Sequence, residues 1–221
     1  ETFSEKEPET LEWIDNFKNG SIFWDIGANV GVYSCYAGKK EKTKVYAFES
    51  SVFNLECLVK NININNLNEV ITIFPLPLTD YTKETDFNLS STDSGSAMAS
   101  FGVRYKSDGS DLNKIFNYKI LGLSIDEIIK NFNLKTPNYI KIDVDGIEHL
   151  ILSGGMRVLF KVDEILVEVD EKFETQVEKV KSILVTSGLK YSGKYQSLMM
   201  QKANKKNRTF NQVWKRNLWK F

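Results

Sequence analysis

Residues 24–31, with the sequence WDIGANVG, contain the feature that decides the fold. A short apolar run at residues 21–26 leads into this stretch and ends in Asp25 and a turn with two glycines. An apolar run bounded by a glycine turn is typical of a buried strand, and residues 30–40 then have the pattern of a helix. The sequence therefore predicts a strand, a turn and a helix in succession, the unit from which nucleotide-binding α/β sheets are built.

Strand and helix patterns alternate along most of the remaining chain. Strands are expected at residues 44–48, 70–74, 139–143 and 164–169, helices at residues 7–17, 55–62, 124–132, 147–151 and 177–184, and a closing hairpin at residues 195–201 and 210–214. Such alternation predicts a mostly parallel sheet with helices on both faces. Because the 221 residues contain no internal repeat and no linker, we expect one domain over residues 1–221, which begins with a helical segment at residues 1–20.

One stretch, residues 90–117, interrupts the alternation. It is rich in Ser, Gly and Asp and has little periodicity. A loop of this length inside a compact domain is usually either functional or disordered. Two interpretations stay open: a loose surface insertion, or a lid that binds the acceptor of a reaction.

Composition excludes several classes of protein. Apolar residues make up 42% and charged residues 26% of the chain, and the 29 basic residues balance the 29 acidic ones. This balance gives no reason to expect a nucleic-acid partner, and no apolar run is long enough to span a bilayer. The first residues lack the pattern of a signal peptide, so we expect a cytoplasmic protein. The two cysteines, Cys35 and Cys57, are expected to be reduced and packed, and the oligomeric state has no signal in the sequence.

The turn after the first strand does not fit a dinucleotide. A G-x-G-x-x-G pattern that starts at Gly27 requires glycine where the chain has Asn29 and Val32. A P-loop also fails, because no Gly-Lys-Ser/Thr follows. These departures argue against an NAD-dependent oxidoreductase. Asp25, just before the turn, instead suggests a ligand with a positive amino group, and S-adenosylmethionine has both an amino group and a sulfonium.

A second acidic residue supports a nucleoside ligand. Glu49 ends the second predicted strand, 24 residues after Asp25. A carboxylate about 20 residues beyond a nucleotide-binding turn is placed to accept hydrogen bonds from both ribose hydroxyls. Glu49 alone could be an exposed charge at a strand end, but together with Asp25 and the glycines it favours the ribose role.

The end of the fourth predicted strand concentrates titratable groups. Residues 140–149, with the sequence IKIDVDGIEH, contain Asp143, Asp145, Glu148 and the single histidine, His149. The last three are candidates for a general base that accepts the proton of an attacking hydroxyl. Alternatively, His149 is a hydrogen-bonded spacer, or the three acids hold a divalent cation. Because three acids in six residues more often divide into structural and ligand-binding roles, we assign no metal ligand.

These stretches together resemble the FkbM family of methyltransferases over most of the chain. Matching segments are residues 7–10 (EPET), 24–31 (WDIGANVG), 45–49 (VYAFE), 60–63 (KNIN) and 141–148 (KIDVDGIE). The resemblance implies a class I methyltransferase fold, Rossmann-like, with a seven-stranded sheet that closes in an antiparallel hairpin. It also implies S-adenosylmethionine-dependent O-methylation, often of a sugar or a related natural product. A binding module that kept the cofactor site without catalysis is the alternative.

The resemblance also assigns roles to individual residues. It implies that residues 77–80 lie beside the adenine. The cofactor-binding positions that it implies are Asp25, Gly27, Ala28, Asn29, Gly31, Glu49, Ser50, Leu78, Asp80 and Asp143. Two departures from the family pattern stand out. Many relatives have proline where this chain has Ser50, and many have glutamate where it has Asp145. Both changes keep the chemistry but leave the acceptor, a small molecule or glycan, unassigned.

Overall fold

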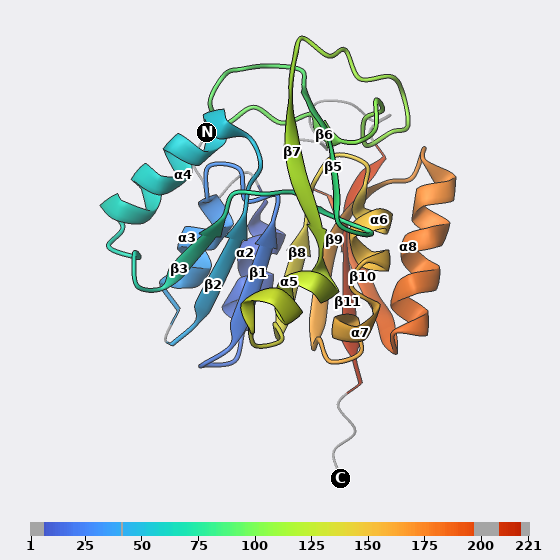
Figure 1. Ribbon diagram of the computed structural model, residues 1–221. Helices are drawn as coiled ribbons and strands as arrows, with labels where there is room; N and C mark the ends of the chain where they lie inside the picture. Colours follow the sequence, from blue (N-terminus) through green and yellow to red (C-terminus); the bar gives the residue numbers. More distant parts are fainter. Residues whose placement is uncertain (1–6, 41, 197–207, 218–221) are drawn as a thin grey trace.

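The computed structural model describes residues 7–40, 42–196 and 208–217. Its main sheet has seven strands in the order β10-β11-β9-β8-β1-β2-β3 (Figure 1). Their bounds are β1 Ile22–Ile26, β2 Lys44–Phe48, β3 Ile71–Phe74, β8 Tyr139–Ile142, β9 Glu164–Asp170, β10 Leu189–Tyr195 and β11 Thr209–Arg216. Neighbouring pairs from β9 to β3 are parallel, whereas β11 is antiparallel to both β9 and β10. The predicted fold class is therefore confirmed.

Helices cover both faces of this sheet, as the alternating pattern predicted. The helices are α2 Pro8–Asp15, α3 Val32–Gly38, α4 Val52–Ile64, α5 Ile125–Phe132, α6 Glu148–Ser153, α7 Met156–Leu159 and α8 Glu174–Thr186. The apolar sides of α2, α3 and α4 pack into one core layer, and those of α5 to α8 pack into the other. At the start of α5, Ser124 and Glu127 form a capping box, in which each side chain bonds to the backbone of the other residue. None of the helices in the described ranges is long and apolar enough to cross a membrane.

A second, smaller sheet lies between β3 and α5, where we predicted no strand. Its order is β4-β7-β5-β6, with β4 Leu78–Thr79, β5 Lys83–Leu89, β6 Ala99–Phe101 and β7 Phe116–Ser124. The expected loop at residues 90–117 is thus the connection between two long antiparallel arms, and it contains β6. In Figure 1 it extends past one end of the main sheet (green). The arms carry many polar residues, so the apolar pattern did not predict them.

The closing hairpin differs from the prediction at its first arm. We expected that arm at residues 195–201, but β10 ends at Tyr195, and residues 197–201 lie outside the described part of the chain. β10 is an edge strand whose residues are mostly exposed after Leu189. An edge strand of this kind lacks the apolar alternation on which the prediction depended. The second arm, β11, contains the predicted residues 210–214.

The turn after β1 needs glycine because it lies against the backbone that follows β8. Gly27 has a φ of 85°, and a Cβ atom built on it would lie 2.0 Å from the carbonyl oxygen of Asp143. Asp143 in turn donates its backbone N–H to the carbonyl of Ile26, at 3.0 Å. This contact fixes the two turns side by side at the carboxyl ends of β1 and β8.

A substitution at Gly27 tests this packing. We expect Gly27→Ala to lower the free energy of unfolding by about 3 kcal/mol, because it combines a left-handed backbone with a clash against the Asp143 carbonyl. Gly20 is the matched control, since its φ of 77° is similar and nothing lies within 4 Å of its Cβ position. Gly20→Ala is expected to cost about 1 kcal/mol. Urea denaturation measures both, and equal losses would contradict the role given to the Asp143 contact.

Candidate functional site

The carboxyl ends of β1, β2 and β8 meet at one edge of the main sheet, which we call the carboxyl edge. The backbone N–H groups of Gly27 and Ala28 donate to the carbonyl oxygen of Phe48, at 3.0 and 2.9 Å. These bonds join the turn after β1 to the end of β2. In parallel α/β sheets, ligands bind outside this edge.

Glu49 fastens the same two turns through its side chain. Its carboxylate oxygens accept the backbone N–H groups of Asn29, at 2.7 Å, and of Ser51, at 2.6 Å. The side chain is 7% exposed, and burial raises the pKa of Glu49 against the opposing effect of these bonds. Each carboxylate oxygen has more than one lone pair, so Glu49 can still accept hydrogen bonds from a ligand. Ser50, beside it, is buried, and its carbonyl accepts the Tyr118 hydroxyl at 2.5 Å.

Asp25 is fully buried beneath the turn. Its Oδ2 accepts the hydroxyl of Ser34 at 2.6 Å, whereas its Oδ1 has no hydrogen-bond partner among the described residues. Burial raises the pKa of Asp25, and the positive charge of Lys141 opposes that shift. An unpartnered buried oxygen is costly, so this atom suits a group that donates a hydrogen bond.

Lys141 supplies the positive charge at the carboxyl edge. Its side chain is 1% exposed, and its Nζ lies 2.7 Å from Oδ2 of Asp143. The same ammonium lies 4.9 Å from the centre of the Tyr33 ring. Burial lowers the pKa of Lys141, but the carboxylates of Asp143 and Asp25 outweigh burial and raise it. The ammonium therefore stays charged and compensates these acids.

The connection between β5 and β7 lies against this edge. Asn29, at a φ of 51°, donates its side-chain amide to the carbonyls of Gly95 and Ser96, at 3.4 and 3.3 Å. Asn54 of α4 exchanges hydrogen bonds with the same two residues. A Cβ on Gly146 would lie 2.8 Å from the Lys106 carbonyl. The stretch thus contacts the turns after β1 and β8, although its role in acceptor binding stays a prediction.

Asp145 is also in contact with this connection. Its Oδ2 accepts the backbone N–H of Met98 at 2.6 Å, and both residues have left-handed backbones, with φ of 60° and 65°. Burial, and then the charge of Asp143, raises the pKa of Asp145 to about 6. The group is therefore poised to exchange a proton near neutral pH.

The other candidate bases, Glu148 and His149, lie in the first turn of α6. Glu148 is 2% exposed, and its carboxylate accepts the N–H of Gly146, at 3.1 Å, and the side-chain amide of Gln176. Burial raises the pKa of Glu148 to about 7. His149 packs edge-on against Phe173, and burial lowers its pKa. Glu148 thus fastens the turn after β8 to α8.

Three further predicted positions have structural contacts. A Cβ on Gly31 would lie 2.3 Å from Leu58, so this glycine lets α4 pack against the turn. Leu78 of β4 is 2% exposed in the core. Asp80 accepts hydrogen bonds from Thr79, Tyr81 and Lys83 at the start of the smaller sheet. Their roles in cofactor binding stay predictions.

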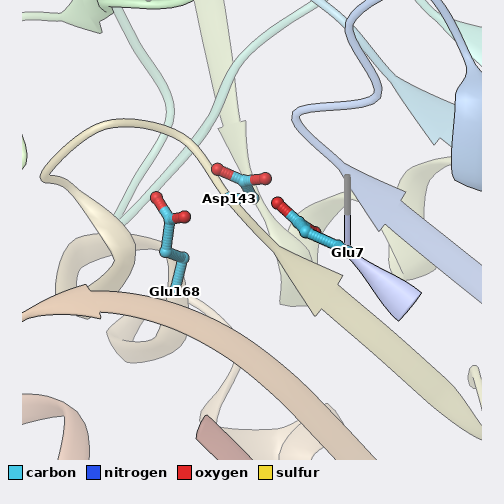
Figure 2. A group of neighbouring side chains, drawn as sticks. All are labelled: Glu7, Asp143 and Glu168. Carbon is cyan, nitrogen blue, oxygen red and sulfur yellow. The ribbon is translucent and has the colours of Figure 1, made fainter. Parts of the chain in front are cut away.

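The structure brings together a set of acids that we did not predict. Ligand atoms of Glu7, Asp143 and Glu168 all lie within 4.8 Å of one another, and we call these three residues the acidic triad (Figure 2). Of the three acids considered from the sequence as ligands of a cation, only Asp143 belongs to this triad. Asp145 and Glu148 instead accept hydrogen bonds from Met98, Gly146 and Gln176. The sequence does mark both residues. Glu168 is an acid that interrupts the apolar run of β9, and Glu7 lies just before α2 in the EPET segment that resembles the FkbM family.

Comparison of the sequence with known proteins identifies a family. The family model described as Methyltransferase FkbM domain matches residues 25–193. A curated protein of Haloferax volcanii, hexuronic acid methyltransferase AglP, is 24% identical over 156 residues, which cover 71% of this chain and 59% of that protein. The chain thus spans about three-fifths of the length of that relative.

Solved structures show the same fold. The methyltransferase FkbM of Methylobacillus flagellatus superposes with a TM-score of 0.61 at 16% identity, over 90% of this chain and 44% of that one. Fibrillarin of Aeropyrum pernix, solved with natively bound S-adenosylmethionine, superposes with a TM-score of 0.53 at 8% identity, over 96% and 75% of the two chains. At these identities the likeness concerns the fold.

The raised pKa of Glu148 predicts a dependence of stability on pH. Because the folded state holds the proton of Glu148 more tightly than the unfolded state does, the free energy of unfolding should fall as pH rises from about 4.5 to about 7. This group contributes at most about 3 kcal/mol to that fall. Glu148→Gln should flatten the slope, whereas Glu178→Gln, on the exposed side of α8, should leave it unchanged. Equal slopes in urea denaturation at several pH values would refute the assignment.

Proposed function

This chain belongs to the FkbM methyltransferase family, and on that premise we propose that it transfers the methyl group of S-adenosylmethionine to a hydroxyl oxygen of a sugar or glycan precursor. The observation that supports this most is Glu49, a buried carboxylate that joins the turns after β1 and β2 and can still accept hydrogen bonds. A nucleoside with two ribose hydroxyls matches that capacity.

The residues of the carboxyl edge fit the cofactor. Glu49 would accept the ribose hydroxyls. Two buried oxygens without a donor, Oδ1 of Asp25 and Oδ1 of Asn29, would suit the amino group of the methionine part. When bound, the cofactor supplies an electrophilic methyl group on a sulfonium. Ala28 lies in the turn after β1, Ser50 follows Glu49 in the turn after β2, and Asp143 follows β8.

Asp145 is the residue we propose as the general base. Methyl transfer to oxygen needs the acceptor hydroxyl to be held in line with the departing sulfur, and it needs a group that takes the hydroxyl proton. A carboxyl with a pKa of about 6 is mostly ionised at neutral pH and can accept that proton on an oxygen atom. Glu148 is less suited, because its oxygens already accept the N–H of Gly146 and the amide of Gln176.

The acceptor class follows from the curated relative and from the segment over the carboxyl edge. The name of the Haloferax protein specifies a hexuronic acid. We therefore propose a sugar or glycan acceptor, with a uronic acid as the first class to test, rather than a nucleic acid. Residues between Gly95 and Lys106 contact the turns after β1 and β8, so this segment is the candidate wall of the acceptor pocket.

Cofactor binding is the first test. Isothermal titration of the purified chain with S-adenosylmethionine should show binding, and Glu49→Gln should weaken it roughly 10- to 100-fold, the equivalent of one hydrogen bond to a charged group. Glu56→Gln, on the exposed side of α4, is the control and should bind as the unchanged chain does. If the unchanged chain shows no binding, the proposal is wrong.

Methyl transfer is the second test. With a labelled methyl group and a panel of uronic acids and glycans, we expect transfer to at least one acceptor. Asp145→Asn should lower kcat by about 10²–10⁴-fold while cofactor affinity changes little, because the amide oxygen still accepts the Met98 N–H but cannot take a proton. Asp111→Asn, an exposed residue in the same connection, is the control. Cofactor binding without transfer to any acceptor would favour a non-catalytic binding module.

A further inference from the structure

We propose that the acidic triad, Glu7, Asp143 and Glu168, together with Asn211, is a binding site for one divalent cation with a preference for oxygen ligands, Mg²⁺ or Mn²⁺. Its members come from four places in the fold: the residue before α2, the end of β8, β9 and β11. Figure 2 shows the three carboxylates directed toward one another. Their ligand atoms lie within 4.8 Å, close enough for a single ion to contact all three.

Charge is the first argument. The side chain of Glu168 makes no hydrogen bond or ion pair within the described part of the chain, and it lies close to the carboxylates of Asp143 and Glu7. Lys141 is the cation close to these acids, and it is shared with Asp25 as well. One ammonium does not balance this many acids, and like charges so close together cannot all stay ionised without another cation. A divalent ion would supply the missing positive charge.

Asn211 is the second, independent observation. It lies directly opposite Glu168 across the β9–β11 pair, so both side chains project from the same face of the sheet. Asn211 is 4% exposed, and its Oδ1 has no hydrogen-bond partner. Its amide is instead close to Glu9, whose pKa it lowers against the larger, opposite effect of burial. A buried amide oxygen that accepts no hydrogen bond is a good ligand for a hard cation.

The members of the site are held by neighbouring groups. Oε2 of Glu7 accepts the hydroxyl of Tyr33 at 2.7 Å and that of Thr10 at 3.1 Å. Asp143 is held by Lys141, whose ammonium favours the ionised carboxylate. Hydrogen bonds of this kind orient the ligands of a metal and are part of a metal site. Four oxygen ligands and no sulfur or imidazole select a hard cation over zinc or copper.

The site would adjoin the region of the proposed chemistry. Asp143 packs its backbone against Gly27, and its charge acts on Asp145. An ion held by the acidic triad and Asn211 would lie near the acceptor, and a hydroxyl bound to such an ion would be more acidic than a free one. This effect on the acceptor hydroxyl rests on the proposed methyl transfer, whereas the cation site itself does not.

Titration with Mn²⁺ tests the site. The full chain, freed of metal by a chelator and then dialysed, is titrated with Mn²⁺ and followed by electron paramagnetic resonance. We expect one saturable site per chain from which Mg²⁺ displaces Mn²⁺. Glu168→Gln and Asn211→Leu should each weaken binding at least tenfold. Glu178→Gln, an exposed acid on α8, should leave it unchanged. Circular dichroism in the absence of metal checks that each variant is folded.

Three outcomes would overturn the proposal. The first is a lack of saturable Mn²⁺ binding by the unchanged chain. The second is binding that folded Glu168→Gln and Asn211→Leu both retain in full. In the third, Mn²⁺ does not bind, but Glu168→Gln weakens the binding of S-adenosylmethionine in the presence of chelator. That result would assign the acidic triad to the cofactor's amino group. Intact Mn²⁺ binding without methyl transfer would refute only the proposed function.

Discussion

The buried ammonium of Lys141 is the interaction on which the carboxyl edge depends. It compensates the charges of Asp25 in β1, which is fully buried, and of Asp143 after β8, whose side chain is 29% exposed, and without it these two acids would repel each other. Breaking a buried ion pair by removal of one partner is strongly destabilising. The charge thus lets two neighbouring strands end in carboxylates, while the close approach of Gly27 holds their turns together.

The main sheet was predictable because its central strands are buried on both faces. β1 and β8 are short, mostly apolar strands with an acid at or just after the carboxyl end, Asp25 and Asp143, and a glycine turn follows each of them. The smaller sheet was not predictable in this way. In β7, exposed positions carry apolar residues such as Phe116 and Leu121 as well as polar ones, so no regular apolar face marks the strand. The pairing of β5 with β7 is a long-range contact, which a local sequence pattern does not contain.

The site was predictable only in part, for a related reason. Acids that adjoin the glycine turn or end a strand, such as Asp25, Glu49 and Asp143, are visible from their positions in the sequence. The acidic triad is not, because it joins Glu7 and Glu168 across most of the chain, and their proximity depends on the way α2 packs on the sheet. The sequence also could not show that the oxygens of Glu148 are used by neighbouring amide groups.

The parallel pairing of β4 with β7 has a consequence for how such a chain can diverge. Leu78 lies opposite Leu123 and Thr79 opposite Ser124, so the two ends of the smaller sheet's segment are paired where the chain leaves the main body and returns to it. The segment between Lys83 and Leu121 is nevertheless anchored to the main body, because Phe87, Leu89 and Phe101 pack in the same core cluster as Trp24 and Phe48 of the main sheet. A change in what the protein recognises is therefore most easily accommodated at exposed positions of this segment, such as Thr92 and Asp93, while its apolar residues keep it attached to the main sheet.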